Sequence, residues 1–301
     1  MLKTYSEIFE KVKKNARRPT IAVALAEDKS VMEAIKVLSA NDIARVILTG
    51  NPKKIKSYAE QVGYPIKEDE VIPAFSEEEG ATRAVELVRL GRAEILMKGH
   101  ITTPALMKAV LDKEKGLRSG DLLSHITVVA VSNYHKLLMV TDGGVNIAPD
   151  LEKKKAIINN AIIFAKKLEI TRPKIAVLAP IEKVNPKIPE TVDAMTLQEM
   201  AERGEFGSAI VEGPVAADVA LSARAAERKG LPSRIAGDTD IILVPGITCG
   251  NAIIKFLMLL AKAEVGGVVV GGRVPIVLLS RSDEPAEKLN STLLALLMSA
   301  L

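Results

Sequence analysis

Short runs of apolar, β-branched residues alternate along this chain with segments whose apolar residues recur at helical spacing. Three strand-like runs, each followed by a helical pattern, open the chain: RPTIAVALA before SVMEAIKVLSAN, ARVILTG before NPKKIKSYAEQVG, and RAEILMKG before TTPALMKAVLD. This order predicts parallel strands joined by right-handed helical crossovers. HITVVAVSN and YHKLLMVTDG then follow one another with too little chain between them for a helix, so we expect them to pair antiparallel.

The alternation restarts after Asn146 with a long helical pattern, LEKKKAIINNAIIFAKKLEI, and ends with the strand PIVLLS and an amphipathic terminal helix. The fold class is therefore α/β, with parallel and mixed sheets. At 301 residues the chain is long enough for two domains. We expect residues 1–140 plus 275–301 to form the first and residues 141–274 the second, with ligands bound in the cleft between them.

Composition excludes several classes of function. Hydrophobic residues make up 48% and charged residues 26%, as in ordinary globular proteins. The net charge of +4 contains no basic block and aromatics are only 3%, so we expect no nucleic-acid partner. No run of eighteen apolar residues predicts a membrane span, and the N-terminus has the pattern of a surface helix rather than a signal peptide. A single cysteine cannot form an internal disulfide, which favours a cytoplasmic location.

The end of the last predicted strand is the first candidate for chemistry. Ser280 and Arg281 follow the apolar residues of PIVLLS, and Asp283 and Glu287 come next. Ligands of open α/β sheets bind beyond the carboxyl ends of strands. A hydroxyl and a guanidinium there can polarise a carbonyl, and a carboxylate can take a proton. The alternative is that these side chains only cap and solvate the strand end.

A second candidate follows the strand that ends at Lys98 and Gly99. Thr102 or Thr103 is placed to cap a helix with Pro104 in its first turn. Backbone N–H groups at a helix start attract phosphate, and Lys98 adds a full charge. Many ordinary helices begin in the same way.

Three further loops carry weaker signals. Arg118 in GLRSGDLLSH is a possible anion contact, and Asn146 in TDGGVNIAPD could donate its amide to a ligand, although a tight interdomain turn explains that segment equally well. We expect Asn251 in VPGITCGN to be a helix N-cap and a contact for the phosphate or CoA substrate. Cys249 has no histidine nearby in sequence, and a small buried cysteine is the more common role than a nucleophile. No metal motif such as HExxH or CxxC is present, and no GxGxxG supports nicotinamide binding.

The order of these segments resembles the phosphate acetyl/butyryl transferase family, on the butyryltransferase side. The resemblance covers nearly the whole chain and is carried by LMKGHITTPALMKAV, GLRSGDLLSH, TDGGVNIAPDLE, EKVNPKIPETVDA, EGPVAADVALS, DTDIILVPGITCGN and PIVLLSRSD. It implies a two-domain fold like that of isocitrate and isopropylmalate dehydrogenases, a homo-oligomer built of dimers, and no bound cofactor. The implied substrates are acyl-CoA or CoA, inorganic phosphate and acyl phosphate.

The resemblance also implies roles for residues. Ser280 and Arg281 match a Ser-Arg pair that acts on the acyl phosphate, and a carboxylate a few residues later is the base for the CoA thiol. An ungapped match gives Glu287, while Asp283 is also close. Thr103 matches the family's phosphate-side threonine, and Lys108 stands where an arginine is usual, which exchanges a bidentate fork for a point charge.

These residues together predict direct attack of a CoA thiolate on an acyl phosphate, with no covalent enzyme intermediate. Three other readings remain open: an acetyl-specific enzyme, an enzyme that takes its acyl group from acyl-carrier protein, and a non-catalytic protein that binds CoA or acyl phosphate. A long acyl groove and a basic docking face would favour the second of these.

Overall fold

The computed structural model describes residues 1–118, 122–278, 280 and 283–299. The chain folds into two compact units, one of residues 5–121 and 265–301 and one of residues 1–4 and 122–264. We call them the terminal unit and the central unit. Their limits differ from the expected 140 and 275, because the antiparallel pair of strands over residues 124–141 hydrogen-bonds with strands of the central unit.

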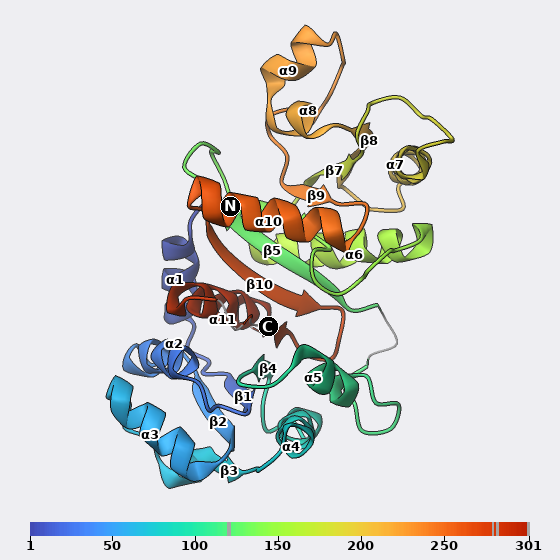
Figure 1. Cartoon of the computed structure of the whole chain (residues 1–301). Helices are drawn as coiled ribbons and strands as arrows, with labels where there is room; N and C mark the ends of the chain where they lie inside the picture. Colours follow the sequence, from blue (N-terminus) through green and yellow to red (C-terminus); the bar gives the residue numbers. More distant parts are fainter. Residues whose placement is uncertain (119–121, 279, 281–282, 300–301) are drawn as a thin grey trace. The chain divides into compact units, whose positions relative to one another are not determined.

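A mixed sheet forms the core of the terminal unit (Figure 1). Its first five strands run parallel and the sixth antiparallel, which confirms the crossovers expected from the alternating pattern. In spatial order the strands are β3 (Val71–Pro73), β2 (Arg45–Gly50), β1 (Thr20–Ala24), β4 (Ile95–Lys98), β11 (Ile276–Val277) and β10 (Glu264–Val270).

Helices α2 (Lys29–Ala40), α3 (Pro52–Val62) and α4 (Glu77–Arg89) of the terminal unit begin at side chains that accept backbone N–H groups. Asp28, Asn51 and Ser76 each cap a helix, and Gly63 ends one in the left-handed conformation that suits glycine. The unit also contains α1 (Tyr5–Lys14), α5 (Thr103–Val110) and α11 (Pro285–Ser299), with a short 3₁₀ turn, η1 (Glu68–Glu70).

The last helix, α11, is more buried than an amphipathic surface helix. It packs against α1 and α2, and its leucines at 293, 294, 296 and 297 are all buried. Each such leucine contributes about 1.5–3 kcal/mol. Lys288, Ser291 and Thr292 are buried as well, because hydrogen bonds within the unit satisfy their polar atoms. The expectation of an amphipathic terminal helix is therefore wrong.

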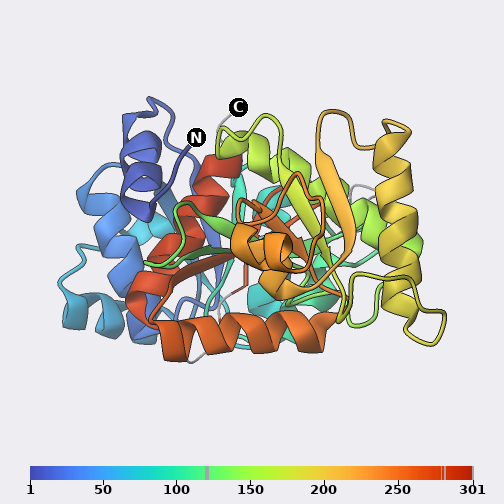
Figure 2. The ribbon, with the colours of Figure 1, turned by 90° about the horizontal axis from the view of Figure 1, so that it is seen from above.

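The central unit has a five-stranded sheet whose first two strands are antiparallel, as the sequence predicted, while the others pair in parallel. The order is β5 (Ser124–Ala130), β6 (Leu138–Thr141), β9 (Ile241–Leu243), β7 (Lys174–Leu178) and β8 (Ile210–Val215). Its helices are α6 (Leu151–Lys167), α7 (Pro189–Glu202), α8 (Ala217–Leu221), α9 (Ala223–Arg228) and α10 (Ile247–Ala261). Helix α7 packs along β8, and Figure 2 shows the two side by side.

The mixed α/β class expected from the sequence is confirmed by both units. Strand β3 and helix α4 are additions that the hydrophobic pattern alone did not predict. Within the described part of the chain, no helix is long and apolar enough to span a membrane.

Candidate active site

Strand β4 delivers Lys98 to the carboxyl edge of the sheet in the terminal unit. The Lys98 side chain is only 4% exposed. After it the chain passes close to the end of β1, where Gly99 donates its N–H to the Ala24 carbonyl at 2.9 Å. A Cβ at Gly99 would overlap the carbonyl oxygen of Leu25, so only glycine fits. The Lys-Gly pair is therefore fixed by the packing of two neighbouring strands.

Strand β11 leads to the candidate segment that contains Ser280 and runs beside β4. It pairs in parallel with β4, with Val277 opposite Met97, so Ser280 and Lys98 follow the ends of adjacent strands. The exposed Ser280 donates its N–H to the Asp283 carboxylate at 2.7 Å. Lys98 thus ends one strand and Ser280 lies three residues beyond the end of its parallel neighbour, and their shared role in one site stays a prediction.

Helix α11 starts directly after this turn. Its first turn contains Glu287, whose carboxylate accepts the N–H of Glu284 at 2.8 Å and so caps the helix. Asp283 and Glu287 are both half-buried and both accept a backbone N–H. Since the two carboxylates have similar surroundings, the geometry leaves both open as the base.

The start of α5 differs in detail from the expectation. Thr102 is the N-cap residue and the helix begins at Thr103, but the Thr102 hydroxyl donates to the Glu77 carboxylate of α4 at 2.7 Å instead of capping its own helix. Thr103 is exposed. Lys108 lies 3.7 Å from Glu78, and both side chains are more than 80% exposed, a kind of pair worth about 0–1 kcal/mol. Helix α5 is thus tied to the acidic first turn of α4.

The loop after β6 in the central unit is organised by a buried carboxylate. Asp142 is 1% exposed and accepts the N–H groups of Gly144, Val145 and His125. Asn146 donates its amide to Asp142 at 2.7 Å and to the Leu123 carbonyl at 2.8 Å. The amide expected to reach a ligand therefore holds this loop.

Two expectations about α10 have clear outcomes. The helix starts at Ile247 with Gly246 as N-cap, so Asn251 lies inside it, exposed, and the expectation of an Asn251 N-cap is wrong. The reason is that Gly250 packs against Gly143 closely enough to leave no room for a Cβ, and the helix extends through that contact. Burial raises the pKa of the Cys249 thiol, which disfavours the thiolate needed for covalent catalysis.

Arg118 and Arg281 are the two arginines predicted to take part in the site. Arg118 is exposed at the end of a loop in the terminal unit. Arg281 lies outside the described residues. Among the residues that are described, no group of three or more His, Cys, Asp or Glu side chains is placed to hold a metal ion.

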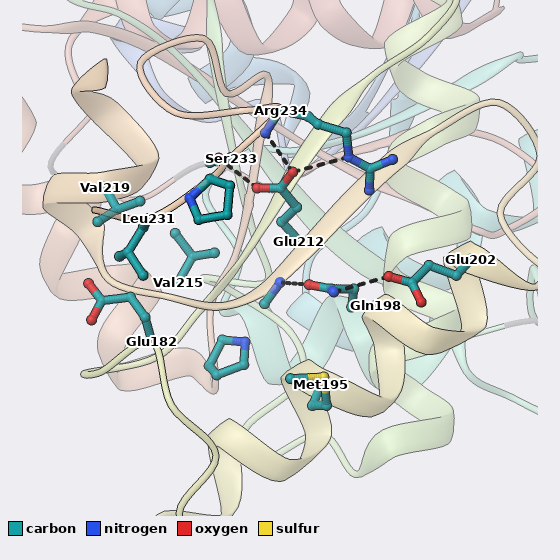
Figure 3. A pocket seen from close by; sticks show the side chains of 13 residues that line it. Glu182, Met195, Gln198, Glu202, Glu212, Val215, Val219, Leu231, Ser233 and Arg234 are labelled. Carbon is teal, nitrogen blue, oxygen red and sulfur yellow. Dashed lines mark hydrogen bonds and ion pairs between the residues drawn. The ribbon is translucent and has the colours of Figure 1, made fainter. Parts of the chain in front are cut away.

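A separate hollow of about 700 Å³ lies in the central unit between α7, β8 and the segment over residues 231–234 (Figure 3). Its floor is apolar, and its polar groups include the carboxylates of Glu182, Glu202 and Glu212. Figure 3 shows the Glu212 carboxylate directed at Ser233 and Arg234, whose hydroxyl and backbone N–H donate to it at 2.6 and 2.7 Å. Lys229 pairs with Glu182 at 2.7 Å and Arg234 with Glu212 at 3.3 Å, so three carboxylates face two cations. The remaining negative balance disfavours a phosphate or a CoA nucleotide.

Sequence reasoning missed three residues at the edge of the terminal sheet. Asp28 caps α2 just after β1, Ser30 follows in the first turn, and the buried Lys288 of α11 contacts both. An aspartate before a helical pattern is a recognisable N-cap signal. Nothing in the local pattern indicated that Lys288 would be buried.

Comparison with known proteins agrees with this geometry. The chain matches the family described as Phosphate acetyl/butaryl transferase over residues 3–79 and 75–296. It is 39% identical to the phosphate butyryltransferase of Clostridium acetobutylicum, over 99% of each chain. A branched-chain phosphotransacylase from Enterococcus faecalis V583 is 32% identical, with a TM-score of 0.81 over 93% of this chain and 99% of that one.

A 4-hydroxythreonine-4-phosphate dehydrogenase from Klebsiella pneumoniae shares 13% identity and a TM-score of 0.54, over 94% of this chain and 100% of that one. At that identity the likeness concerns the fold alone, and it confirms the dehydrogenase-like architecture expected from the sequence. The family match and the full-length relatives agree with one another, and on these grounds the chain belongs to the phosphate acetyl/butyryl transferase family.

Proposed function

We propose that this protein interconverts acyl-CoA plus inorganic phosphate and acyl phosphate plus CoA, with butyryl or another short chain as the acyl group. In the direction of phosphorolysis, a phosphate oxygen bonds to the thioester carbonyl carbon, the carbon–sulfur bond breaks and CoA leaves as the thiolate. The observation that carries the proposal is the parallel register of β4 and β11, which supports a shared site for Lys98 and Ser280.

The phosphate side of the reaction is assigned to Lys98, Arg118 and the start of α5 at Thr103. Lys98 is a buried cation at a sheet's carboxyl edge, where removal from water strengthens its attraction for an anion. The Thr102 hydroxyl, which donates to Glu77, contributes by fixing the first turn of α5, and Lys108 contributes only surface charge.

The acyl side is assigned to Ser280 and Arg281, which stabilise the oxyanion as the carbonyl is attacked. One such donor is typically worth about 2.7–4 kcal/mol in the transition state. Asp283 or Glu287 takes the thiol proton in the reverse direction. A CoA thiol with a pKa of about 8.5 is mostly protonated at neutral pH, so a base at this point raises the rate.

Transfer is direct, in a ternary complex, with no acyl group held on the enzyme. The raised pKa of Cys249 and its position inside α10 support this assignment. Radiolabelled butyryl phosphate incubated without CoA should leave no label on the protein. Label on Cys249 would overturn direct transfer.

We propose a homo-oligomer built of dimers, supported by the surface of α10. Phe256, Leu259 and Leu260 are 63%, 76% and 79% exposed, and this helix is apolar on nearly every side. A helix with that composition is normally buried. Leu259→Glu should convert the assembly to smaller particles in light scattering, and an unchanged mass would exclude α10 from the interface.

The deciding experiment supplies purified protein with butyryl-CoA or acetyl-CoA, with and without inorganic phosphate, and follows thiol release. We expect release that requires phosphate, is faster with butyryl-CoA, and yields an acyl phosphate trapped by hydroxylamine. A preference for acetyl-CoA would indicate a phosphate acetyltransferase. Activity only with acyl groups on acyl-carrier protein would indicate the enzyme that depends on this carrier. A thermal shift with CoA but no turnover would indicate a binding protein and overturn the proposal. We place the reaction in the cytoplasm, consistent with a single unpaired cysteine.

A further inference from the structure

Lys288 is a buried cation in the first turn of α11, and the proposed chemistry does not use it. Its side chain is 2% exposed. The ammonium donates to the Ser30 hydroxyl at 2.6 Å and lies 3.6 Å from the Asp28 carboxylate. Burying a lysine is costly unless it is paired and hydrogen-bonded, so its place here calls for a specific role.

The partners of Lys288 belong to the chain that leaves β1. The Ser30 hydroxyl donates to Asp28 at 2.6 Å, and the same carboxylate oxygen accepts the N–H of Val31 at 2.9 Å and so caps α2. Burial raises the pKa of Asp28. The hydrogen bonds and the charge of Lys288 lower it by more than burial raises it, so the pKa lies below its ordinary value. Asp28 is therefore an anion that holds α2 and Lys288 at once.

The chain is attached to the terminal unit both before and after the proposed catalytic groups. On one side β11 pairs with β4 up to Val277. On the other, Lys288 is bound to Asp28 and Ser30, one residue after Glu287. Only about ten residues separate the two attachments. Ser280 lies three residues after the first attachment, and Glu287 lies one residue before the second.

We propose that Lys288 is a positioning residue, whose ion pair with Asp28 and hydrogen bond to Ser30 set the location of Glu287, Asp283 and Ser280 for acyl transfer. The inference rests on the proposed function. Lys288 acts through Glu287 and the turn before it, since its ammonium is occupied by Asp28 and Ser30. A misplacement of about 1 Å at reacting groups can reduce a rate on the order of 10²-fold.

The test measures kcat, the KM of each substrate and thermal unfolding for five proteins: the parent, Lys288→Met, Ser30→Ala, the double variant Lys288→Met/Asp28→Asn and a control variant. The double variant removes both charges, so it leaves no unpaired charge buried. Lys154→Met is the matched control, because Lys154 is also a buried lysine, paired with Asp193 at 2.6 Å in the central unit. Ser30→Ala removes the two hydrogen bonds of the Ser30 hydroxyl, from Lys288 and to Asp28, but keeps the ion pair between Lys288 and Asp28. It therefore keeps the test valid if Lys288→Met does not fold.

We expect kcat to fall on the order of 10²-fold in Lys288→Met, with little change in either KM, and to fall less in Ser30→Ala. The double variant should regain thermal stability and still have low kcat, whereas Lys154→Met should lose stability and keep the parental kcat. Activity that returns together with stability would show a purely structural role and overturn the inference. If the parent is active and Lys288→Met is equally active, the inference about Lys288 is wrong while the proposed function stands. If the parent has no phosphate-dependent turnover, the proposed function and this inference are both wrong.

Discussion

The strand ends of the terminal unit and the hollow of the central unit show how differently two regions of one protein are suited to ligands. The hollow offers about 700 Å³ and an apolar floor, but its polar groups are mainly carboxylates that bind neighbouring side chains and backbone. The strand ends offer a buried lysine and a serine on adjacent parallel strands.

Charge, more than volume, separates the two. In the hollow a phosphate meets a net negative charge, because Lys229 and Arg234 are already paired with Glu182 and Glu212. Beside Lys98 it meets a positive charge in surroundings where water screens little. An anionic substrate therefore favours the strand ends over the larger hollow. A variant in one region can be tested with a variant in the other region as its control.

Loss of the base should have the largest effect. Replacing Asp283 and Glu287 individually by their amides should reduce turnover about 10²–10⁴-fold in one of the two variants, because proton removal from the thiol is then unassisted. The pH–rate profile of each variant is the measurement, and the true base is the one whose amide loses the acid limb. If both amides keep the parental profile, neither residue is the base.

Removal of the guanidinium should be nearly as severe. Arg281→Ala should lower kcat about 10²–10³-fold while the fold survives, because the oxyanion loses a cationic donor. Arg234→Ala in the hollow is the matched control, and circular dichroism checks both folds. Equal rates in the two variants would remove Arg281 from the mechanism.

Lys98→Met should act mainly on phosphate. We expect the KM for phosphate to rise about 10–100-fold, in line with the loss of one charge-assisted hydrogen bond, while the KM for acyl-CoA changes little. Lys136→Met removes an equally buried lysine of the central unit, paired with Asp240 at 2.6 Å, and should destabilise that unit without this effect. A parental phosphate KM in Lys98→Met would contradict the assignment.

The smallest effect on catalysis is expected in the hollow itself. Glu212→Gln weakens the bonds to Ser233 and Arg234 and should reduce stability by about 1–3 kcal/mol, as seen by thermal unfolding. Its kcat and KM values should stay parental. A tenfold change in either kinetic constant would mean that the hollow takes part in the reaction.

Much of the framework was readable from the sequence because local signals agreed with the fold. The strand that ends at Lys98 and the helices that follow Asn51 and Thr102 were predicted by hydrophobic period, although the Thr102 side chain does not cap its own helix. The antiparallel pair β5–β6 followed from the short connection between two apolar runs. The parallel pairing of β11 with β4 agrees with the strand-end rule, and a shared site for Lys98 and Ser280 stays a prediction.

The remainder depends on tertiary contacts that no local pattern encodes. The sequence predicted Asn251 as an N-cap, but α10 starts earlier, at Ile247. Gly250, just before Asn251, already lies inside the helix and packs against Gly143. No sequence pattern singled out Lys288, and only the fold brings α11 against the capping aspartate of α2. The choice between Asp283 and Glu287 depends on where a substrate thiol lies, which neither sequence spacing nor their similar backbone contacts decide.

The most direct test is a crystal structure of the protein grown with butyryl phosphate or inorganic phosphate. The account predicts a phosphoryl group within hydrogen-bonding distance of the Lys98 ammonium, at the ends of β4 and β11. A phosphoryl group bound instead in the hollow beside Glu212, with none near Lys98, would contradict it.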